Sequence, residues 1–249
     1  MKLTILGSGT SAPLLDRSNA GYLLETGNLK FLLDSGAGTI RRLLEVRADL
    51  FKINNIFYTH LHNDHINDLG AIIWSNNYGG TRKNALNLYG PRGFKKYYNI
   101  LVNQLLKPHK LYFDVNIKEL KKSQLKIGGV TIKTYEIKHS STTKSIAYRI
   151  EFKGKSFVYT GDAEYQKSIA EIAKNCDALL TECSLPDSKR EDGHLTPSLA
   201  GRIAAKSNAK ALILTHFYPE VLKTDIMKQC RKVFDGKIIL AKDKLSINI

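Results

Sequence analysis

The chain has 249 residues, of which 43% are hydrophobic, so it can bury a full core and we expect a single domain over residues 1–249. No run approaches the roughly eighteen apolar residues of a membrane-spanning helix, no apolar segment follows a basic leader, and the three cysteines form no CxxC pair, which argues against a membrane protein and a cysteine zinc site. We predict a cytoplasmic protein, and its formal charge of +15 favours an acidic partner such as nucleic acid, a phosphorylated metabolite or an anionic surface.

Short apolar runs rich in Val, Ile, Phe and Tyr alternate with turn residues and amphipathic stretches, which is typical of mixed α and β layers. Strands are predicted at 2–6, 20–26, 30–34, 55–59, 86–89, 130–137, 145–152, 155–160, 177–181, 211–215 and 237–240. Helices are predicted at 38–46, 65–75, 91–106 and 220–233. The clearest helix follows Thr196, an N-cap residue, with Pro197 at the first helical position.

Residues 59–68, THLHNDHIND, contain three of the chain's seven histidines between a predicted strand and a predicted helix. Alternate residues at a strand end face the same side, which aims His60 and His62 together. Asp64 and His65 then begin the helix and address a second point a few ångströms away. Imidazole and carboxylate ligands suit zinc, manganese or iron, and two such ions about 3.5–4 Å apart form a hydrolytic clamp.

Residues 92–138 carry eleven Lys and Arg against three Asp and Glu. This stretch could guide a nucleic-acid strand by charge, with Tyr97, Tyr98, Tyr112 and Phe113 stacking on bases. Such aromatic residues more often pack beneath a helix, which is the interpretation we favour. A solvated lysine-rich face explains the charge equally well.

Three further ligand types stand where a predicted strand ends. His139 follows the strand at 130–137, Asp162 ends the sequence YTGD, and His216 ends LILTH. Gly161 lets the backbone turn tightly before Asp162. A carboxylate has two oxygens and can bridge two cations, so Asp162 is the predicted bridge. A lone histidine at a strand end is usually structural, but four strand ends that all carry ligands favour a metal site.

The sequence HLHNDH at 60–65 resembles the HxHxDH signature of the metallo-β-lactamase superfamily, and the resemblance covers nearly the whole chain. It implies an α/β fold, a four-layer αββα sandwich with a dinuclear site at one edge of the sheets. It implies that one cation is held by His60, His62 and His139, the other by Asp64, His65 and His216, with Asp162 between them. The superfamily's early aspartate matches Asp34 in LLDSGAG, which we expect to orient a ligand histidine.

Within the superfamily the chain resembles ribonuclease Z and its short relatives. The similar stretches are GSGTSAP at 7–13 with Arg17 and Asn19 behind it, LLTECS at 179–184, GHLTP at 193–197 and LILTHFYP at 212–219. The second resembles the HEAT motif of that family and the third its HST motif. The resemblance implies hydrolysis of phosphodiesters, with RNA among the candidate substrates, and a homodimer.

The expected chemistry follows from charge. Two cations lower the pKa of a water, the resulting hydroxide attacks phosphorus in line, and the cations stabilise the charge of the transition state. The predicted catalytic residues are Asp64 at the metal site, His194 as the proton donor to the departing oxygen, and Glu182, which orients His194. The alternative for His194 is an ordinary position at the entry to the helix that follows Thr196.

Two departures from ribonuclease Z bear on the substrate. Ribonuclease Z enzymes that mature transfer RNA commonly carry a long Gly- and Pro-rich arm between the residues that match His139 and Asp162. Only 22 residues lie there in this chain, and the predicted strands 145–152 and 155–160 fill them. Thr181 also replaces the HEAT histidine. Both features weigh against transfer-RNA processing and leave the hydrolytic centre unchanged.

Several alternatives stay open. The substrate could be RNA or a small or cyclic nucleotide diester, and a carboxylic ester, thioester or lactone is the second choice because the same hydroxide attacks carbonyl carbon. Zn²⁺ is the first choice for both cations, and Mn²⁺ or Fe²⁺ would be accepted by the same ligands. A non-catalytic metal- or RNA-binding module is disfavoured because all seven ligand positions are retained.

Overall fold

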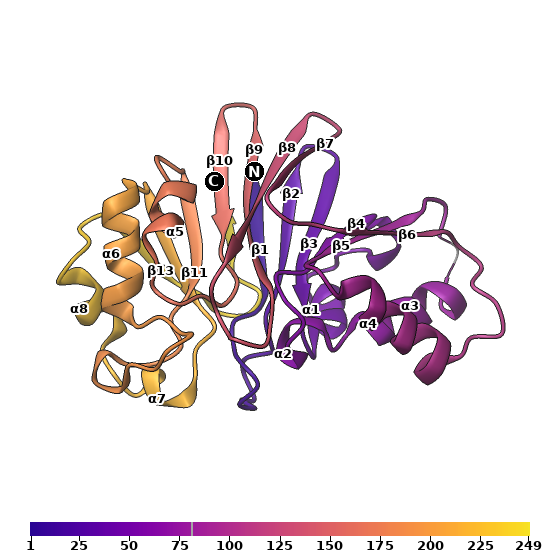
Figure 1. Cartoon of the computed structure of the whole chain (residues 1–249), viewed down its shortest axis with the longest axis horizontal. Helices are drawn as coiled ribbons and strands as arrows, with labels where there is room; N and C mark the ends of the chain where they lie inside the picture. The colour runs from indigo at the N-terminus through magenta and orange to yellow at the C-terminus, as the bar shows by residue number, and fades with distance from the viewer. Residues whose placement is uncertain (81) are drawn as a thin grey trace.

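The computed structural model describes residues 1–80 and 82–249, which form two seven-stranded sheets packed face to face (Figure 1). In spatial order the first sheet contains β14 (Ser246–Asn248), β1 (Lys2–Gly7), β2 (Gly21–Thr26), β3 (Leu29–Ser35), β4 (Asn55–Phe57), β5 (Leu86–Gly90) and β6 (Val115–Glu119). The second contains β13 (Lys237–Leu240), β12 (Ala211–Thr215), β11 (Ala178–Glu182), β10 (Lys155–Tyr159), β9 (Ser145–Phe152), β8 (Val130–Ile137) and β7 (Ser123–Ile127).

Helices cover the outer faces of both sheets (Figure 1). Beside the first sheet lie α1 (Thr39–Glu45), α2 (Asn63–Ile66), α3 (Leu69–Tyr78), α4 (Phe94–Ile100) and a π-helical turn, η2 (Leu101–Leu106). Beside the second lie α5 (Lys167–Ile172), α6 (Pro197–Ser207), α7 (Pro219–Leu222) and α8 (Ile226–Arg231). Two short 3₁₀ turns, η1 (Leu50–Lys52) and η3 (Asp187–Lys189), complete the described elements. The predicted αββα sandwich is confirmed, and none of these helices is long and apolar enough to cross a bilayer.

The layers follow from the two-residue period of the strands. In β3, Phe31 and Leu33 point into the core between the sheets, whereas Leu32 points the other way, into a second apolar cluster. That second cluster contains Ile72 of α3 and Phe94 of α4. One strand therefore supplies side chains to both cores, which fixes its register because a one-residue slip would exchange the two faces.

Two predicted helices are interrupted. The helix expected at 65–75 begins at Asn63 and breaks after Ile66, because the backbone N–H of Asp68 donates to the carbonyl of Ser35 at 2.9 Å. The helix expected at 220–233 divides into α7 and α8, and Asp225 caps α8 by accepting a hydrogen bond from the Lys228 N–H. Both breaks arise from polar contacts that satisfy backbone groups outside the helix.

Other differences concern edges and helix ends. Strands β6, β7 and β14 and helix α5 were not predicted, and the helix expected at 91–106 begins at Phe94 and finishes as the π-helical turn η2. The three missed strands lie at sheet edges, where no burial on both faces imposes an apolar run. The strand pair predicted between 145 and 160 is present as β9 and β10.

Strand direction brings several strand ends to one edge. Strands β3, β4 and β5 are parallel, as are β10, β11 and β12. Strand β8 is antiparallel to β9, and β9 is antiparallel to β10, so β8 and β10 run the same way. The carboxyl ends of these strands therefore open at a common edge, near α2 (Figure 1). Ligands of open α/β sheets bind at such ends.

Candidate metal centre

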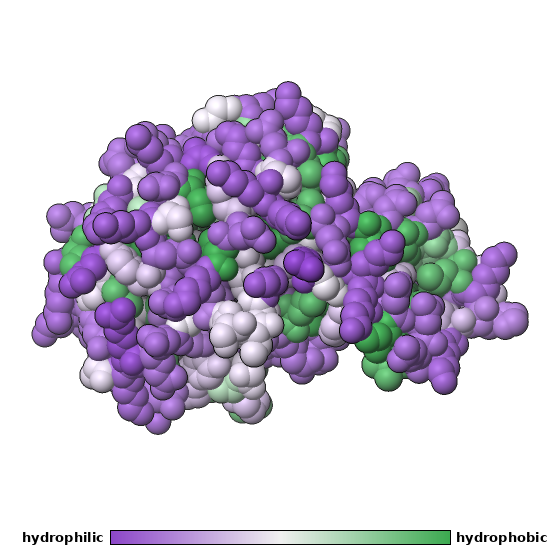
Figure 2. Space-filling model, viewed as in Figure 1, coloured by the Kyte–Doolittle hydropathy of each residue, from purple (hydrophilic) through white to green (hydrophobic). Residues whose placement is uncertain are grey.

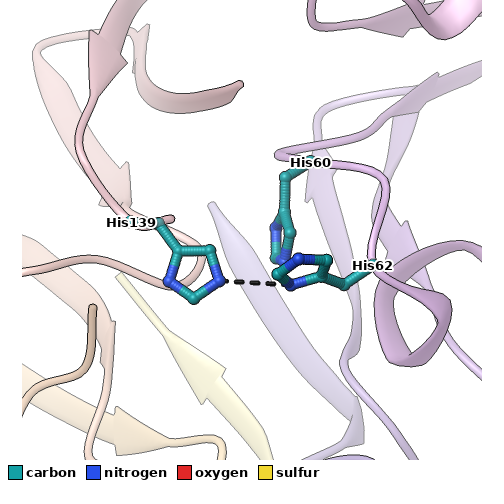
Figure 3. Close-up of side chains that lie close together, drawn as sticks. All are labelled: His60, His62 and His139. Atoms are coloured by element: carbon teal, nitrogen blue, oxygen red, sulfur yellow. Dashed lines mark hydrogen bonds between the residues drawn. The ribbon is translucent and has the colours of Figure 1, made fainter. Parts of the chain in front are cut away.

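Three histidines from both sheets form what we call the outer histidine group, His60, His62 and His139. The first two leave the first sheet between β4 and α2, and His139 follows β8 of the second sheet. Figure 3 shows His139 facing His60 and His62 from the opposite side, with its Nε2 atom 3.2 Å from Nδ1 of His62. The buried Nε2 atom of His60 points into this group without a hydrogen-bond partner.

The remaining ring nitrogens of the outer histidine group contact uncharged oxygens. Nδ1 of His60 lies 3.0 Å from Oγ1 of Thr59, and Nε2 of His62 lies 2.9 Å from Oγ1 of Thr143. Nδ1 of His139 lies 2.8 Å from the carbonyl oxygen of Gly193. Gly193 has a φ of +87°, and a Cβ there would come within 2.6 Å of the His139 carbonyl. Each ring is therefore fixed from behind, with one nitrogen left for the centre.

A second set, which we call the inner group, contains Asp64, His65 and His216. Nε2 of His65 lies 3.2 Å from Nε2 of His216, which lies 3.3 Å from Oδ2 of Asp64. Nδ1 of His216 lies 3.0 Å from the hydroxyl of Ser184. All three side chains of the inner group are buried.

Asp162 lies between the two groups. Its Oδ1 atom is 3.2 Å from Nε2 of His65, and its Oδ2 atom is 3.4 Å from Nε2 of His216. On the other side, Oδ2 is 3.9 Å from Nε2 of both His60 and His139. The preceding Gly161 has a φ of +61°, and a Cβ at this position would lie 2.6 Å from the Thr59 side chain. Glycine is therefore needed to bring Asp162 into place.

Asp34 supports the inner group from behind. Its carboxylate is 2.8 Å from Nδ1 of His65 and accepts hydrogen bonds from the backbone N–H and the hydroxyl of Thr59, at 2.7 and 2.8 Å. The Tyr159 hydroxyl donates to the same carboxylate at 2.6 Å. Asp34 and His216 have φ values of 55° and 57°, a left-handed conformation that is costly for residues other than glycine. The chain holds both side chains in place despite this strain.

The charges of the two groups differ. Burial, together with the neighbouring His65, lowers the pKa of His60 well below its usual value, and burial beside His139 also lowers the pKa of His62. Burial alone would lower the pKa of His65, but the charges of Asp162 and Asp34 raise it well above its usual value. Burial would raise the pKa of Asp162, but the nearby histidines hold it well below its usual range. His60 and His62 are thus ready as neutral ligands, and Asp162 is ionised.

The donor set fits divalent cations. The ligand atoms of His60, His62 and His139 all lie within 4.8 Å of one another, and the same holds for those of Asp64, His65 and His216. Nε2 of His60 is buried without a hydrogen-bond partner, which is costly unless another group completes it. Cations would supply that partner and would separate nitrogens that now approach to 3.2 Å. The structure thus brings together all seven predicted ligand residues.

A pair of residues, His194 and Glu182, lies beside the outer histidine group. Nδ1 of His194 is 3.0 and 3.1 Å from the two carboxylate oxygens of Glu182, which also accepts hydrogen bonds from the backbone N–H groups of Ala163 and Leu195. Burial would lower the pKa of His194, but the charge of Glu182 raises it to about 9. His194, His62 and His139 line a pocket of about 520 Å³. The predicted pair of His194 and Glu182 therefore lies together, next to the candidate metal ligands.

Sequence reasoning missed three supporting residues, Thr143, Tyr159 and Ser184. Ser184 has a signal in hindsight, because it stands two residues after Glu182, donates to that carboxylate and contacts His216. The sequence gives no such signal for the other two. Tyr159 looks like an ordinary aromatic residue of a strand, and Thr143 lies in a loop, where no periodic pattern predicts the direction of a side chain. The N-terminal loop, one of the stretches that resemble ribonuclease Z, contacts the segment that carries His216. The guanidinium of Arg17 lies 5.0 Å from the ring centroid of Phe217, the residue after His216.

Comparisons with known proteins show which proteins the chain is similar to. A family model described as a Beta-lactamase superfamily domain matches residues 30–217. The ribonuclease Z of Methanocaldococcus jannaschii is 30% identical over 317 residues, which cover 100% of this chain and 97% of that protein. The probable metallo-hydrolase YhfI of Bacillus subtilis is 28% identical over 251 residues, 97% of each chain. The first alignment is longer than this chain, so that ribonuclease Z carries segments that this chain lacks.

Solved structures give the same fold. The crystal structure of YhfI from Bacillus subtilis superposes with a TM-score of 0.86 at 25% identity, covering 99% of this chain and 98% of that chain. The short form of human tRNase Z superposes with a TM-score of 0.83 at 23% identity, covering 100% of this chain and 99% of that chain. The human structure is evidence for the fold alone.

Proposed function

Because the chain belongs to the metallo-β-lactamase superfamily, in its ribonuclease Z-like branch, we propose that it is a dinuclear metal-dependent hydrolase of phosphodiester bonds in RNA or in small or cyclic nucleotide diesters. The observation that carries this proposal is the position of Asp162, whose carboxylate faces histidines of both groups at 3.2 to 3.9 Å. One carboxylate placed between two sets of nitrogen ligands suits a bridge between two cations.

The ligand roles follow from this arrangement. The outer histidine group would hold one cation, the inner group would hold the other, and Asp162 would bridge them, with Zn²⁺ as the first choice and Mn²⁺ or Fe²⁺ as alternatives. Bound cations supply Lewis acidity that lowers the pKa of a water and neutralises charge on a phosphate. Asp34 keeps the ring of His65 in the orientation that this role requires, through their 2.8 Å contact.

In this proposal His194 would deliver a proton. Its Nδ1 atom is fixed by Glu182, so its Nε2 atom is the one free to face a substrate in the adjoining pocket. A pKa raised to about 9 keeps this ring protonated at neutral pH. A departing alkoxide needs such a donor, and a positioned acid of this kind contributes about 10²- to 10⁴-fold in rate.

Turnover of bis-p-nitrophenyl phosphate with added Zn²⁺ or Mn²⁺ tests the activity. The wild-type protein is expected to hydrolyse this diester, and Asp64→Ala is expected to lose turnover because it removes an inner ligand. His109→Ala is the matched control, since this exposed histidine lies outside both groups. Equal turnover by the wild-type protein and Asp64→Ala would end the phosphodiesterase proposal.

A substrate panel tests the choice of diester. Only 22 residues separate His139 from Asp162, and β9 and β10 occupy them, so we expect little cleavage of transfer-RNA precursors compared with single-stranded RNA or cyclic and linear nucleotide diesters. Carboxylic ester, thioester and lactone substrates belong in the same panel as the competing class. Efficient cleavage of a precursor at its 3′ side would contradict the expectation drawn from the short connection.

A further inference from the structure

Three aromatic side chains are exposed and in contact on the lobe that carries α3. Trp74, Tyr78 and Tyr112 are 43%, 51% and 65% exposed. The ring centroids of Trp74 and Tyr78 are 4.8 Å apart, and those of Tyr78 and Tyr112 are 6.5 Å apart. Figure 2 shows hydrophobic and hydrophilic side chains side by side over this lobe. Aromatic rings that gather at the surface usually mark an interaction site, so we call these three residues the aromatic surface.

The aromatic surface is held in place by hydrogen bonds from buried residues. Asn77 of α3 donates through Nδ2 to the carbonyl of Lys110 at 2.8 Å and accepts from the backbone N–H of Tyr112 at 2.8 Å. These bonds fasten the segment before β6 onto the helix that carries Trp74 and Tyr78. The rings therefore present a formed platform, and ordering them on binding would cost little.

Basic residues outnumber acidic residues around this platform. From Leu69 to Phe113 the sequence contains seven Lys and Arg and no Asp or Glu. A pocket of about 350 Å³ adjoins the platform, and its lining includes Lys83, Lys110, Tyr112 and Asp114. Exposed rings next to an excess of positive charge suit a ligand that carries both flat bases and phosphates.

We propose that the aromatic surface, with Lys83 and Lys110, is a binding site for single-stranded nucleic acid. Bases would stack on Trp74, Tyr78 and Tyr112, and phosphates would pair with the two lysines. This inference rests on the proposed function and deepens it, because it names an unpaired polynucleotide as the substrate class. Helix α3 begins shortly after the α2 residues Asp64 and His65, and its ten residues span about 15 Å, so one strand can reach both sites.

Charge argues against a second copy of this chain as the occupant. In a two-fold symmetric dimer the same patch faces itself, so Lys83 and Lys110 would meet their own counterparts. Like charges that face each other across an interface are unfavourable, and lysine is depleted from interface cores. A polyanion meets no such penalty.

Fluorescence anisotropy of a labelled oligothymidylate of about 20 nucleotides tests the proposal without relying on catalysis. Trp74→Ala/Tyr112→Ala is expected to raise the dissociation constant about tenfold or more, and Trp74→Phe/Tyr112→Phe, which keeps the rings, is expected to bind within a few-fold of wild type. Lys83→Gln/Lys110→Gln should reduce the slope of log K against log salt by about 1.4, because two phosphate contacts are lost.

Controls separate this site from the metal centre. Lys228→Gln/Lys232→Gln removes the same charge on and beside α8, at the opposite end of the molecule (Figure 1), and is expected to leave the slope nearly unchanged. All of these variants should hydrolyse bis-p-nitrophenyl phosphate like wild type, because that substrate is too short to reach the aromatic surface. If the wild-type protein did not hydrolyse the diester, the proposed function would be refuted, but the oligonucleotide-binding result would be unaffected.

Two results with Trp74→Ala/Tyr112→Ala would overturn the proposal. One is unchanged oligonucleotide affinity in Trp74→Ala/Tyr112→Ala while the wild-type protein binds. The other is a change of the same variant in oligomeric state, measured by sedimentation, with no change in affinity, which would assign the surface to contact between copies. A wild-type protein that fails to bind the oligonucleotide at low salt would refute it as well.

Discussion

The outer histidine group and the inner group differ in what stands behind them. Behind the outer histidines are neutral oxygens, of which the Thr143 hydroxyl and the Gly193 carbonyl are examples, and His62 is only half-buried. In the inner group the Asp34 carboxylate contacts His65 directly, whereas carboxylates reach His216 and His60 only through the hydroxyls of Ser184 and Thr59.

This difference predicts that the two proposed cation positions are not equivalent. A carboxylate behind an imidazole raises the basicity of the ligand nitrogen and fixes its tautomer more firmly than a hydroxyl does. The inner position is also better shielded from water, since Asp64, His65 and His216 are all buried whereas His62 of the outer group is only half-buried. We therefore expect the inner cation to bind more tightly, and the outer cation to exchange more readily through the pocket beside His62.

Removal of the Asp162 carboxylate should have the largest effect on turnover, since both proposed cation positions share this side chain. Asp162→Ala is expected to lower turnover by about 10³-fold or more, because both cations lose a ligand and their mutual charge is no longer neutralised. The measurement combines metal content with kcat/KM, and the exposed Asp235→Ala is the control. Retention of both cations with near-normal turnover would contradict the bridging role.

His194→Gln tests the outer side, because the ring centroid of His194 lies 5.1 Å from that of His139 and 6.2 Å from that of His216 in the inner group. We expect kcat for a nucleotide diester to fall by about 10²-fold or more, since an alkoxide leaves poorly without a proton. Bis-p-nitrophenyl phosphate should be hardly affected, because p-nitrophenolate leaves without that help. An equal loss on both substrates would indicate a structural role for His194.

The supporting residues provide a direct test of the unequal positions. Asp34→Asn is expected to lower the affinity for the inner cation by about 100-fold, and Thr143→Val is expected to lower the affinity for the outer cation by about tenfold. These values are the ends of the usual range for residues that hydrogen-bond to a metal ligand. Competition with a coloured chelator measures both constants. If Thr143→Val weakened binding as much as Asp34→Asn, the distinction between the two groups would be lost.

The pH dependence of loading should show the smallest but most selective effect. Without cations the pKa of His65 lies well above its usual value, so at neutral pH this ring holds a proton that the inner cation must displace. The affinity of that cation should fall about tenfold for each pH unit below the pKa of His65. The pKa of His60 is lowered, so the outer cation should show little dependence near neutral pH. Histidine ¹⁵N chemical shifts report both rings, and a neutral His65 in the cation-free protein would refute this account.

The convergence of the site was predictable because His60, His139, Asp162 and His216 each follow an apolar strand, and parallel strand ends meet at one edge. The residues that support the ligands were not predictable from the sequence. Thr143, for example, contacts His62 only because the fold brings two distant segments together, and no local sequence pattern indicates this contact. The same limit applies to the fold. The break after Ile66 depends on a hydrogen bond between Ser35 and Asp68, which are distant in the sequence.

Exposure of aromatic residues in the basic stretch was also only partly predictable. Burial was the favoured interpretation for Tyr97, Tyr98, Tyr112 and Phe113. It is confirmed for Tyr98, which is buried in the second apolar cluster, and in part for Tyr97 and Phe113, which pack against that cluster. Tyr112 is exposed instead, because Asn77 fastens its backbone to α3 while the ring turns outward.

Anomalous diffraction from crystals grown without chelator and loaded with Zn²⁺ tests the central claim most directly. The account predicts two zinc peaks about 3.5–4 Å apart, one within the outer histidine group and one within the inner group, with the Asp162 carboxylate between them. At limiting zinc the inner peak should appear first. A single peak at full loading, peaks away from these seven side chains, or no peak at all would contradict it.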